Sequence, residues 1–361
     1  HGRASLARRN RRPLGPLDLR SQAILRAVIE EYVNTAQPVG SLALVERYGL
    51  GVSSATVRNI LAELEQAGLL THPHTSAGRM PTDAGYRFYV ESIAETMPLP
   101  AVEQLMIRHQ FGQVEFASEH WFRLAATTLA GLTRSAGLAT PAKPSAAHVR
   151  RVDLVAVNER MASLILVLRE GSIKQAAVPL DEDDAVDQAT LNKVAALLNE
   201  RLTDATASRA EQLLAAASGA DIVERVAKRV GERIVRVLRD FDEAAVEEVF
   251  SDGLLNVMEA PEFAQSDKLR QVFTALENRA YLGELVGSVA EGGRIRVFIG
   301  AENHPLEMHE VSLVLAPYGR PGRAIGVVGV LGPTRMSYPQ AIGTVRFVSG
   351  LMNELVDHLY A

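Results

Sequence analysis

The stretch SSATVRN, residues 53–59, decides the fold of the N-terminal part of this 361-residue chain. Ser53 is a favoured N-cap residue, and the apolar residues after it repeat at the spacing of one buried helix face, at Val57, Ile60, Leu61 and Leu64. Gly68 then stops the pattern. The sequence therefore predicts a helix over 54–67 whose outward face begins with small and polar side chains, at Ser54, Ala55, Arg58 and Asn59.

Two further helices are predicted upstream of this one. The first runs from about Leu19 to Tyr32, where apolar residues recur along one face. The segment QPVG at 37–40 has the composition of a turn, and Ser41 is expected to cap a short helix, Leu42–Tyr48, that Gly49 ends. A short helix joined by a tight turn to the 54–67 helix is a helix-turn-helix arrangement.

The segment after the third helix changes character. Pro73, Gly78 and Pro81 interrupt it, which predicts a short β-hairpin between Leu69 and Pro81. Thr82 is then expected to cap another helix. Helices followed by a two-stranded hairpin are the order of elements in a winged helix-turn-helix.

The third helix and the hairpin supply candidate DNA contacts. An Arg side chain matches the O6/N7 edge of guanine and an Asn side chain matches the N6/N7 edge of adenine, so Arg58 and Asn59 are candidates for reading bases. Hydroxyl groups bind phosphate, which positions a protein on DNA without specifying sequence. The other candidate DNA contacts are Ser41, Ser53, Ser54 and Thr56 near the helix starts and His74, Thr75, Ser76 and Arg79 on the hairpin.

Each of these features also has a plainer interpretation. SSATVRN fits an ordinary capped helix with a solvated face, and His72 and His74 fit a surface loop. A metal site is not expected, because the chain contains no cysteine and these two histidines have too few further ligands nearby. No cofactor is predicted either.

The charge distribution sets the N-terminal part apart from the rest. Residues 1–90 contain 11 Lys and Arg against 7 Asp and Glu, whereas residues 91–361 contain 27 against 36. A basic head on an acidic body is typical of a nucleic-acid-binding module joined to other domains. Residues 1–16 hold five Arg and are expected to form a flexible basic arm, which fits a solvated tail better than a phosphate contact.

Composition excludes several classes of protein. Apolar residues make up 47% of the chain, which supports a folded core. The longest stretch without a charged residue, Tyr32–Val45, is too short to span a membrane, and the N-terminus lacks an apolar signal segment, so we expect a cytoplasmic protein. The motifs G-x-S-x-G, the P-loop and H-E-x-x-H are absent, so we do not expect an enzyme.

The rest of the chain predicts a mixture of helices and strands. After a linker at 97–100 and helices over 101–135, strands are expected at 152–157, 162–169, 172–178, 294–300, 311–318 and 324–331, with a final helix at 340–360. About 80 residues of helical pattern follow the first three strands, and the last three strands begin only at 294. We therefore expect one β-sheet interrupted by a helical insert near 182–262.

The insert carries a strongly amphipathic stripe. Its apolar residues recur at helical spacing between charged ones, at Val223, Val226, Val230, Ile234, Val237 and Phe241. The stripe fits a helix that contacts a partner and equally a helix in the core of its own domain, and the pattern leaves both open. The acidic run Asp181–Asp184 favours a solvated loop over a cation site.

Several motifs resemble those of one bacterial family. The chain closely resembles the HrcA family of heat-inducible transcription repressors at 37–41 (QPVGS), 53–59, 63–68 (ELEQAG) and 72–90 (HPHTSAGRMPTDAGYRFYV). The segments 298–303 (FIGAEN) and 332–338 (GPTRMSY) are similar to C-terminal motifs of the same family. The resemblance runs from about Leu17 to the end, and it departs from the family at the Arg-rich arm and at Leu42, where a Lys often follows the GS.

The resemblance implies a multi-domain α+β protein. Residues 17–96 would form a winged helix-turn-helix DNA-binding domain behind the arm at 1–16. Residues 97–181 and 263–361 would form a GAF-like α/β domain with an antiparallel sheet. Residues 182–262 would form an inserted, mainly helical dimerisation domain with dimer contacts at Val223, Val226, Val230, Ile234 and Val237.

The resemblance also implies a function. Members bind as dimers to an inverted-repeat operator upstream of chaperone operons and prevent transcription, and the GroEL chaperonin keeps them active. The expected partners are double-stranded DNA, a second copy of the chain and GroEL.

Two other functions are alternatives to this one. One alternative is a one-component winged-helix regulator gated by a small effector, in a pocket lined from 152–178 and 297–331. An enzyme with a DNA-binding head is a third possibility, and the missing catalytic motifs disfavour it.

Overall fold

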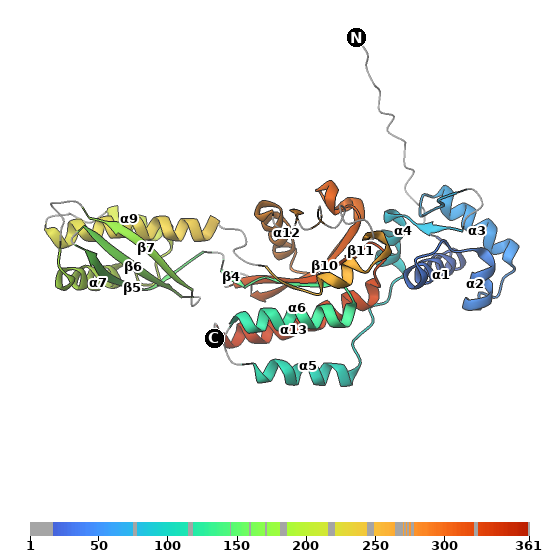
Figure 1. Ribbon diagram of the computed structural model, residues 1–361, viewed down its shortest axis with the longest axis horizontal. Coiled ribbons are helices and arrows are strands. Elements are labelled where there is room, and N and C mark those ends of the chain that lie inside the picture. The colour runs from blue at the N-terminus through green and yellow to red at the C-terminus, as the bar shows by residue number, and fades with distance from the viewer. Residues whose placement is uncertain are drawn as a thin grey trace, which may run out of the picture.

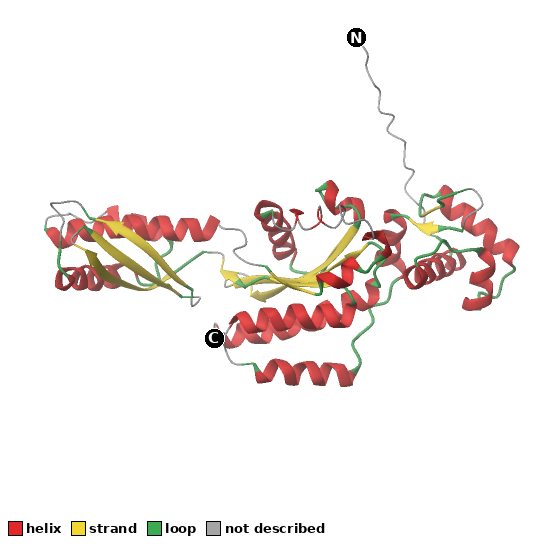
Figure 2. Cartoon of the chain, viewed as in Figure 1, coloured by secondary structure: helices red, strands yellow, loops and turns green. Residues whose placement is uncertain are grey.

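The structure, a computed structural model, describes residues 17–74, 78–114, 118–144, 146–158, 160–169, 172–180, 186–215, 221–243, 249–263, 270, 272, 274–275, 278–320 and 324–359. The predicted basic arm, Thr75, Ser76 and Asp181–Asp184 lie outside these residues. The described part consists of helices and antiparallel sheets, which confirms the predicted α+β class. It forms an elongated row of three units (Figures 1 and 2).

The first unit contains three helices, a hairpin and a fourth short helix, in the predicted order. The elements are α1 (Leu19–Thr35), α2 (Ser41–Tyr48), α3 (Ser54–Gln66), β1 (Leu70–Thr71), β2 (Met80–Pro81), α4 (Asp83–Phe88) and the π-helix η1 (Tyr89–Ile93). Two predicted caps are confirmed, because Ser53 Oγ accepts from the Thr56 N–H and Thr82 Oγ1 accepts from the Gly85 N–H. Gly49 ends α2 in the left-handed conformation, as predicted.

The predicted cap of α2 is wrong by one residue. Gly40 occupies the N-cap position and makes no side-chain bond there, while Ser41 is the first helical residue. The Ser41 hydroxyl contacts the Ser54 hydroxyl at 3.0 Å, so it bonds to α3 and does not cap its own helix.

The middle unit is a six-stranded antiparallel sheet between two layers of helices. The strands lie in the order β8 (Phe250–Asp252), β3 (Ala136–Ala139), β11 (Ala324–Pro333), β10 (Val311–Arg320) and β9 (Arg296–Ile299), and β4 (Lys143–Pro144) also pairs with β11. One side carries α5 (Ala101–Gln113), α6 (Ser118–Thr133) and α13 (Tyr338–Leu359) (Figure 1). The other side carries α10 (Leu254–Met258), the 3₁₀ turn η3 (Pro261–Phe263) and α12 (Arg279–Gly292), and two more 3₁₀ turns follow β9, η4 (Gly300–Glu302) and η5 (Leu306–Met308).

The sequence of strand β10 does not alternate between apolar and polar residues, because both faces of the strand are buried. Val314 packs in the core that α6 and α13 share, whereas Leu313 and Leu315 pack in the core on the α12 side. Because helices cover both faces of the sheet here, all residues from Val311 to Ala316 are buried.

The third unit is a three-stranded sheet covered by three helices on one face. The strands β5 (Val149–Asn158), β6 (Met161–Leu168) and β7 (Ile173–Pro179) pair antiparallel in chain order. The helices are α7 (Gln188–Leu202), α8 (Ala207–Ala215) and α9 (Ile222–Glu243). Alternate strand residues such as Leu164 and Leu166 pack with α9 in a core of their own.

The expectation of one interrupted sheet is wrong. The strands over 149–179 form a separate sheet, so the insert begins before Val149. The expected end of the insert is also wrong, because β8 pairs with β3 of the middle sheet. Strand β3 was not predicted, because its small residues have low strand propensity. A glycine is required at position 137, since a side chain there would overlap the Ala126 carbonyl of α6.

Helices in the described ranges are all too short or too polar to cross a membrane.

Candidate nucleic-acid interface

Helix α3 presents the candidate base-reading residues on its exposed face. The opposite face of α3 is buried inside the first unit, as predicted, with Val57, Ile60, Leu61 and Leu64. Ala55, Arg58 and Asn59 are exposed. Within the described residues, the side chains of Arg58 and Asn59 make no hydrogen bond or ion pair, so both are free to meet a ligand.

The serine and threonine candidates gather around the starts of α2 and α3. Ser41 and Ser54 share a hydrogen bond of 3.0 Å between their hydroxyls. Ser53 Oγ lies 3.0 Å from Thr56 Oγ1 and accepts from the Thr56 backbone N–H at 3.2 Å. The structure thus brings four of the predicted hydroxyls to one end of α3.

The candidate DNA contacts on the hairpin differ in their exposure. His74 is exposed beyond β1, and Thr75 and Ser76 lie outside the described residues. Arg79 stands at the start of β2 with only 23% of its side chain exposed, and its Nε lies 2.7 Å from Glu65 Oε2. Arg79 therefore ties the hairpin to α3, a role that the sequence did not predict.

Glu65 is the main residue that sequence reasoning missed. Its other carboxylate oxygen contacts His72 Nδ1, so one side chain at the end of α3 holds both arms of the hairpin. Glu65 lies in the ELEQAG motif, but its partners are seven and fourteen residues away across a turn. Only the tertiary fold reveals this contact.

The turn at 37–40 completes the base of the hairpin. Val39 and Arg79 exchange backbone hydrogen bonds of 2.9 and 2.8 Å, which adds a third extended segment beside β2. A side chain on Gly78 would lie 2.6 Å from the backbone of Pro38 and Val39. The motifs at 37–41 and 72–90 are therefore in direct contact.

A buried carboxylate joins the first two helices. Glu31 of α1 is 8% exposed and accepts from the Arg47 guanidinium and from Tyr48 Oη at 3.2 Å. Burial, together with this neighbouring carboxylate, raises the pKa of Tyr48 to about 12. These contacts fix α2 on α1 and thereby support the helix pair that presents α3.

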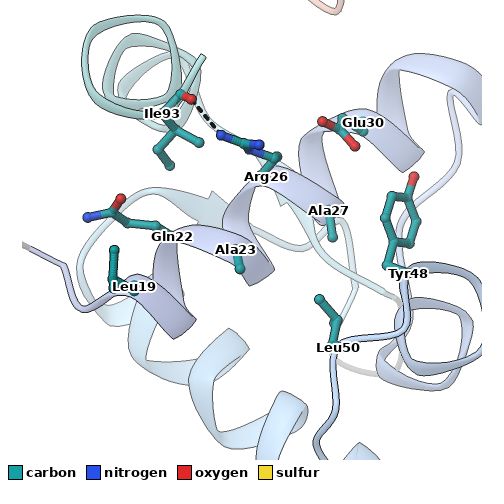
Figure 3. A pocket seen from close by; sticks show the side chains of 9 residues that line it. All are labelled: Leu19, Gln22, Ala23, Arg26, Ala27, Glu30, Tyr48, Leu50 and Ile93. Atoms are coloured by element: carbon teal, nitrogen blue, oxygen red, sulfur yellow. Dashed lines mark hydrogen bonds between the residues drawn. The ribbon is translucent and has the colours of Figure 1, made fainter. Parts of the chain in front are cut away.

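A groove of about 380 Å³ runs along α1 in the same unit (Figure 3). Arg26 crosses it and donates from Nη2 to the Ile93 carbonyl at 2.8 Å. Burial raises the pKa of Glu30 on the same wall. None of the candidate DNA contacts lines this groove, so it is separate from the interface.

The expected dimer contacts on α9 require a correction. Val226, Val230 and Ile234 are 0% exposed and pack against α7, α8 and the strands of their own unit, and Val223 and Val237 are half-buried against the same core. The stripe is therefore intramolecular core, the second of the two interpretations that the pattern left open.

The expected effector pocket also requires a correction. It needed residues 152–178 and 297–331 to line one cavity, but these residues belong to separate sheets with separate cores. In the described ranges, no group of three or more His, Asp or Glu is placed to hold a metal ion.

Comparisons with known proteins cover nearly the whole chain. The HrcA protein C-terminal domain matches residues 119–342. The heat-inducible transcription repressor HrcA of Chloroflexus aurantiacus is 41% identical over 96% of this chain and 95% of that protein. The protein of the same name from Roseiflexus castenholzii is 41% identical over 94% and 95%.

A solved structure is similar as well. The crystal structure of a hypothetical protein at 2.2 Å resolution matches with a TM-score of 0.59 and 23% identity, over 95% of this chain and 100% of that one. This likeness supports the fold alone. The domain match and the sequence identities together show that the chain belongs to the HrcA family of heat-inducible transcription repressors, which are regulators and not enzymes.

Proposed function

We propose that this protein is a homodimeric heat-shock repressor that binds an inverted-repeat operator upstream of chaperone operons and blocks their transcription. The observation that carries the proposal is the exposed start of α3, where Arg58 and Asn59 are unpaired and hydroxyl groups lie beside them. Repression of this kind requires occupancy of the operator and no chemistry.

The roles of the residues follow from their chemistry. Arg58 and Asn59 read base edges in the major groove, because their side chains match guanine and adenine. Ser41, Ser53, Ser54 and Thr56 bind phosphates at the start of α3. The first unit, over 17–96, acts as a winged helix-turn-helix, and His74, Thr75 and Ser76 of the wing contact the DNA backbone or minor groove. Arg79, which pairs with Glu65, holds the wing on α3.

The division of the rest of the chain follows the sheets. We assign the middle unit as the GAF-like domain, with a first part over 97–144 and a second part over 249–361. The unit over 146–243 is the inserted dimerisation domain. The inserted unit was expected at 182–262. We place it at 146–243 because its residues form a hydrophobic core separate from those of the middle unit.

We infer that the dimer forms through the uncovered face of the β5–β6–β7 sheet. Its helices cover only the opposite face, and the uncovered face carries apolar side chains with large exposed fractions: Val155 47%, Val157 59%, Met161 38% and Ile173 67%. The half-buried Ile165 and Val167 lie between them on β6. Polar side chains of Arg151, Asp153 and Gln175 lie among these apolar residues. Exposed apolar side chains gathered on one face are typical of an interface, and a twofold contact would cover them with the same face of a second copy.

The chaperonin part of the proposal rests on family membership. GroEL keeps the repressor active, and heat releases repression when the chaperonin is occupied by unfolded proteins. Nuclease footprinting on DNA upstream of a chaperone operon tests the proposal. It predicts a protected inverted repeat whose two halves are protected at the same protein concentration, and protection of a single half or of no defined site would contradict it.

A further inference from the structure

The motifs FIGAEN (298–303) and GPTRMSY (332–338) lie where the first unit meets the middle unit. Both motifs come from the middle unit, far from α3 in sequence, and the DNA contacts make no use of them. Their side chains and backbone bond to α4 and α1 of the first unit. We call this set of contacts the joint.

The first contact of the joint is a two-point pairing of Arg87 with Glu302. Arg87 Nε donates to Glu302 Oε1 at 2.8 Å and Arg87 Nη2 pairs with Glu302 Oε2. Arg87 Nη2 also donates to the Val297 carbonyl of β9 at 2.6 Å. Glu302 is itself fixed, because its Oε2 accepts from the Ile299 N–H at 2.9 Å. A paired guanidinium and carboxylate define an angle as well as a distance.

The second contact lies one turn away on α4. Asp83 Oδ2 accepts from the Ala301 backbone N–H at 2.9 Å. Gly300 makes this approach possible, since it adopts a φ of +49° and a side chain there would lie 2.5 Å from Asp83 Oδ2. The glycine of FIGAEN is thus required by a residue of the first unit.

The third contact is made by Arg335 of GPTRMSY. Its Nη1 donates to the carbonyl of Val33, in the last turn of α1, at 3.1 Å, and its Nε pairs with Glu262. A cation at a helix C-terminus satisfies a carbonyl that has no partner within the helix. Arg335 therefore holds the end of α1 against the middle unit.

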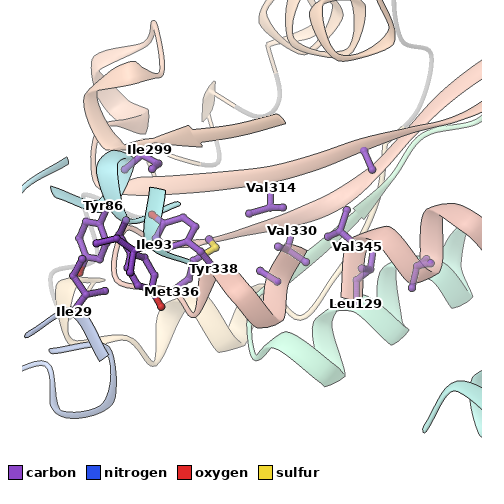
Figure 4. Packing of buried hydrophobic residues seen from close by; sticks show 14 of the residues in the cluster. Ile29, Tyr86, Ile93, Leu129, Ile299, Val314, Val330, Met336, Tyr338 and Val345 are labelled. Carbon is purple, nitrogen blue, oxygen red and sulfur yellow. The ribbon is translucent and has the colours of Figure 1, made fainter. Parts of the chain in front are cut away.

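A shared core lies between these polar contacts. The rings of Tyr86 and Tyr338 lie 5.7 Å apart, and Tyr338 is fully buried (Figure 4). Ile29 and Ile93 from the first unit and Met336 from the middle unit belong to the same hydrophobic cluster. The inserted unit differs, because its core is separate from that of the middle unit.

We propose that the joint sets the orientation of the DNA-binding unit, so that Arg87, Asp83, Glu302 and Arg335 act as positioning residues for operator recognition. The inference rests on the proposed function. A dimer can engage both halves of an inverted repeat only if the distance between its two recognition helices is about one helical turn of DNA, roughly 34 Å, or a multiple of it, and both helices face the same side of the duplex. With a fixed joint the protein accepts one half-site spacing, and with a loosened joint it accepts several.

The absence of cysteine from the chain allows a direct test of the joint. Spin labels on cysteines introduced by Gln66→Cys, at the exposed end of α3, and Leu306→Cys, 77% exposed in the middle unit, report the distance between the two units. The labelled full chain is diluted into unlabelled protein, and pulsed electron paramagnetic resonance gives the distance distribution. The proposal predicts a single narrow distribution that broadens with Arg87→Ala.

The matched control is Arg108→Ala. Arg108 pairs with Glu354 inside the middle unit at 3.1 Å, and both side chains are at least half exposed. This variant should leave the distribution narrow. Equal widths in the two variants would overturn the proposal. If Arg87→Ala does not unfold cooperatively and is therefore misfolded, Arg87→Lys replaces it as the test variant. This substitution keeps the charge but loses the two-point pairing, and it should broaden the distance distribution to an intermediate width.

Binding to DNA provides the second readout. The protein is titrated with inverted repeats whose half-sites are moved apart by 5 base pairs, and with a single half-site. Arg87→Ala should reduce the preference for the native spacing at least about fivefold while changing affinity for the half-site less than about twofold. An unchanged preference, or an equal loss on the half-site, would overturn the positioning role. If the unaltered protein shows no preference for an inverted repeat, the proposed function fails, whereas the label distances still decide whether the joint is rigid.

Discussion

Glu65 of α3 and Arg79 of the hairpin form an ion pair in which Nε and Oε2 are 2.7 Å apart, and both side chains are about three-quarters buried. The same carboxylate contacts His72 on the other arm of the hairpin. A single side chain therefore fixes the hairpin against α3, and the two candidate DNA-contacting elements move as one.

Glu65→Ala tests this contact through stability. It removes the carboxylate that contacts two partly buried side chains, Arg79 and His72, so we expect the free energy of unfolding to fall by about 1–3 kcal/mol. Urea denaturation of the full chain measures it. Glu63→Ala, exposed on the same helix, should change it by less than about 0.5 kcal/mol, and equal losses in the two variants would show that the contact contributes nothing.

Arg58→Ala tests base reading. If Arg58 contacts a guanine edge, the substitution should weaken binding to the operator by about 1–3 kcal/mol and leave binding to a scrambled duplex nearly unchanged. Gln66→Ala, exposed at the far end of α3, is the control and should bind as the unaltered protein does. An equal loss on both duplexes would make Arg58 a phosphate contact.

Ile173→Asp tests the proposed dimer face. Ile173 is 67% exposed on the uncovered face of the three-stranded sheet, and a carboxylate there would be buried in an apolar interface. We expect the dimer dissociation constant to rise at least about tenfold, as measured by sedimentation. Leu306→Asp, similarly exposed in the middle unit, should leave the dimer intact. A dimer that tolerates Ile173→Asp would place the interface elsewhere.

Glu224 of α9 gives the inserted unit a defined pH dependence. Two hydrogen bonds from Arg201, of 2.6 and 2.9 Å, hold the pKa of Glu224 below its ordinary value of 4.5. A lowered pKa in the folded state means that the pair stabilises the fold above pH 4.5 and that this stability disappears as the pH falls through the folded-state pKa. Glu224→Gln should therefore be destabilising at neutral pH, and its deficit in chemical denaturation should shrink below pH 4.5. Glu232→Gln, exposed on the same helix, should show no such trend, and a Glu224→Gln deficit that is constant with pH would reject this account.

Local signals predicted the first unit well, because its elements are defined by residues close together in sequence. Ser53 and Thr82 cap the helices that they precede, and the spacing of Val57 to Leu64 gives the buried face of α3 directly. The same reasoning failed at Ser41, whose hydroxyl bonds across to Ser54, a partner that no local pattern reveals.

Strand pairing was less predictable, since residues 149–179 and 296–333 have similar apolar patterns. Nothing in those patterns states that β6 pairs only with β5 and β7, or that β11 pairs with the inconspicuous Ala136–Ala139. The α9 stripe shows the same limit, because an amphipathic helix has one apolar face whether it packs on its own chain or on a second one. Pairings such as Glu65–Arg79 and Arg87–Glu302 arise only when distant segments meet.

We propose that the protein recognises an inverted repeat as a dimer. Fluorescence anisotropy of the purified protein on an inverted-repeat duplex and on a scrambled duplex, over a salt series and with and without chaperonin, tests it most directly. We expect tight binding to the repeat alone, with two protomers per duplex. The scrambled duplex should bind weakly, and this binding should disappear as the salt concentration rises. Equal and steeply salt-dependent binding to both duplexes, or no binding to the repeat even with chaperonin, would contradict the proposal.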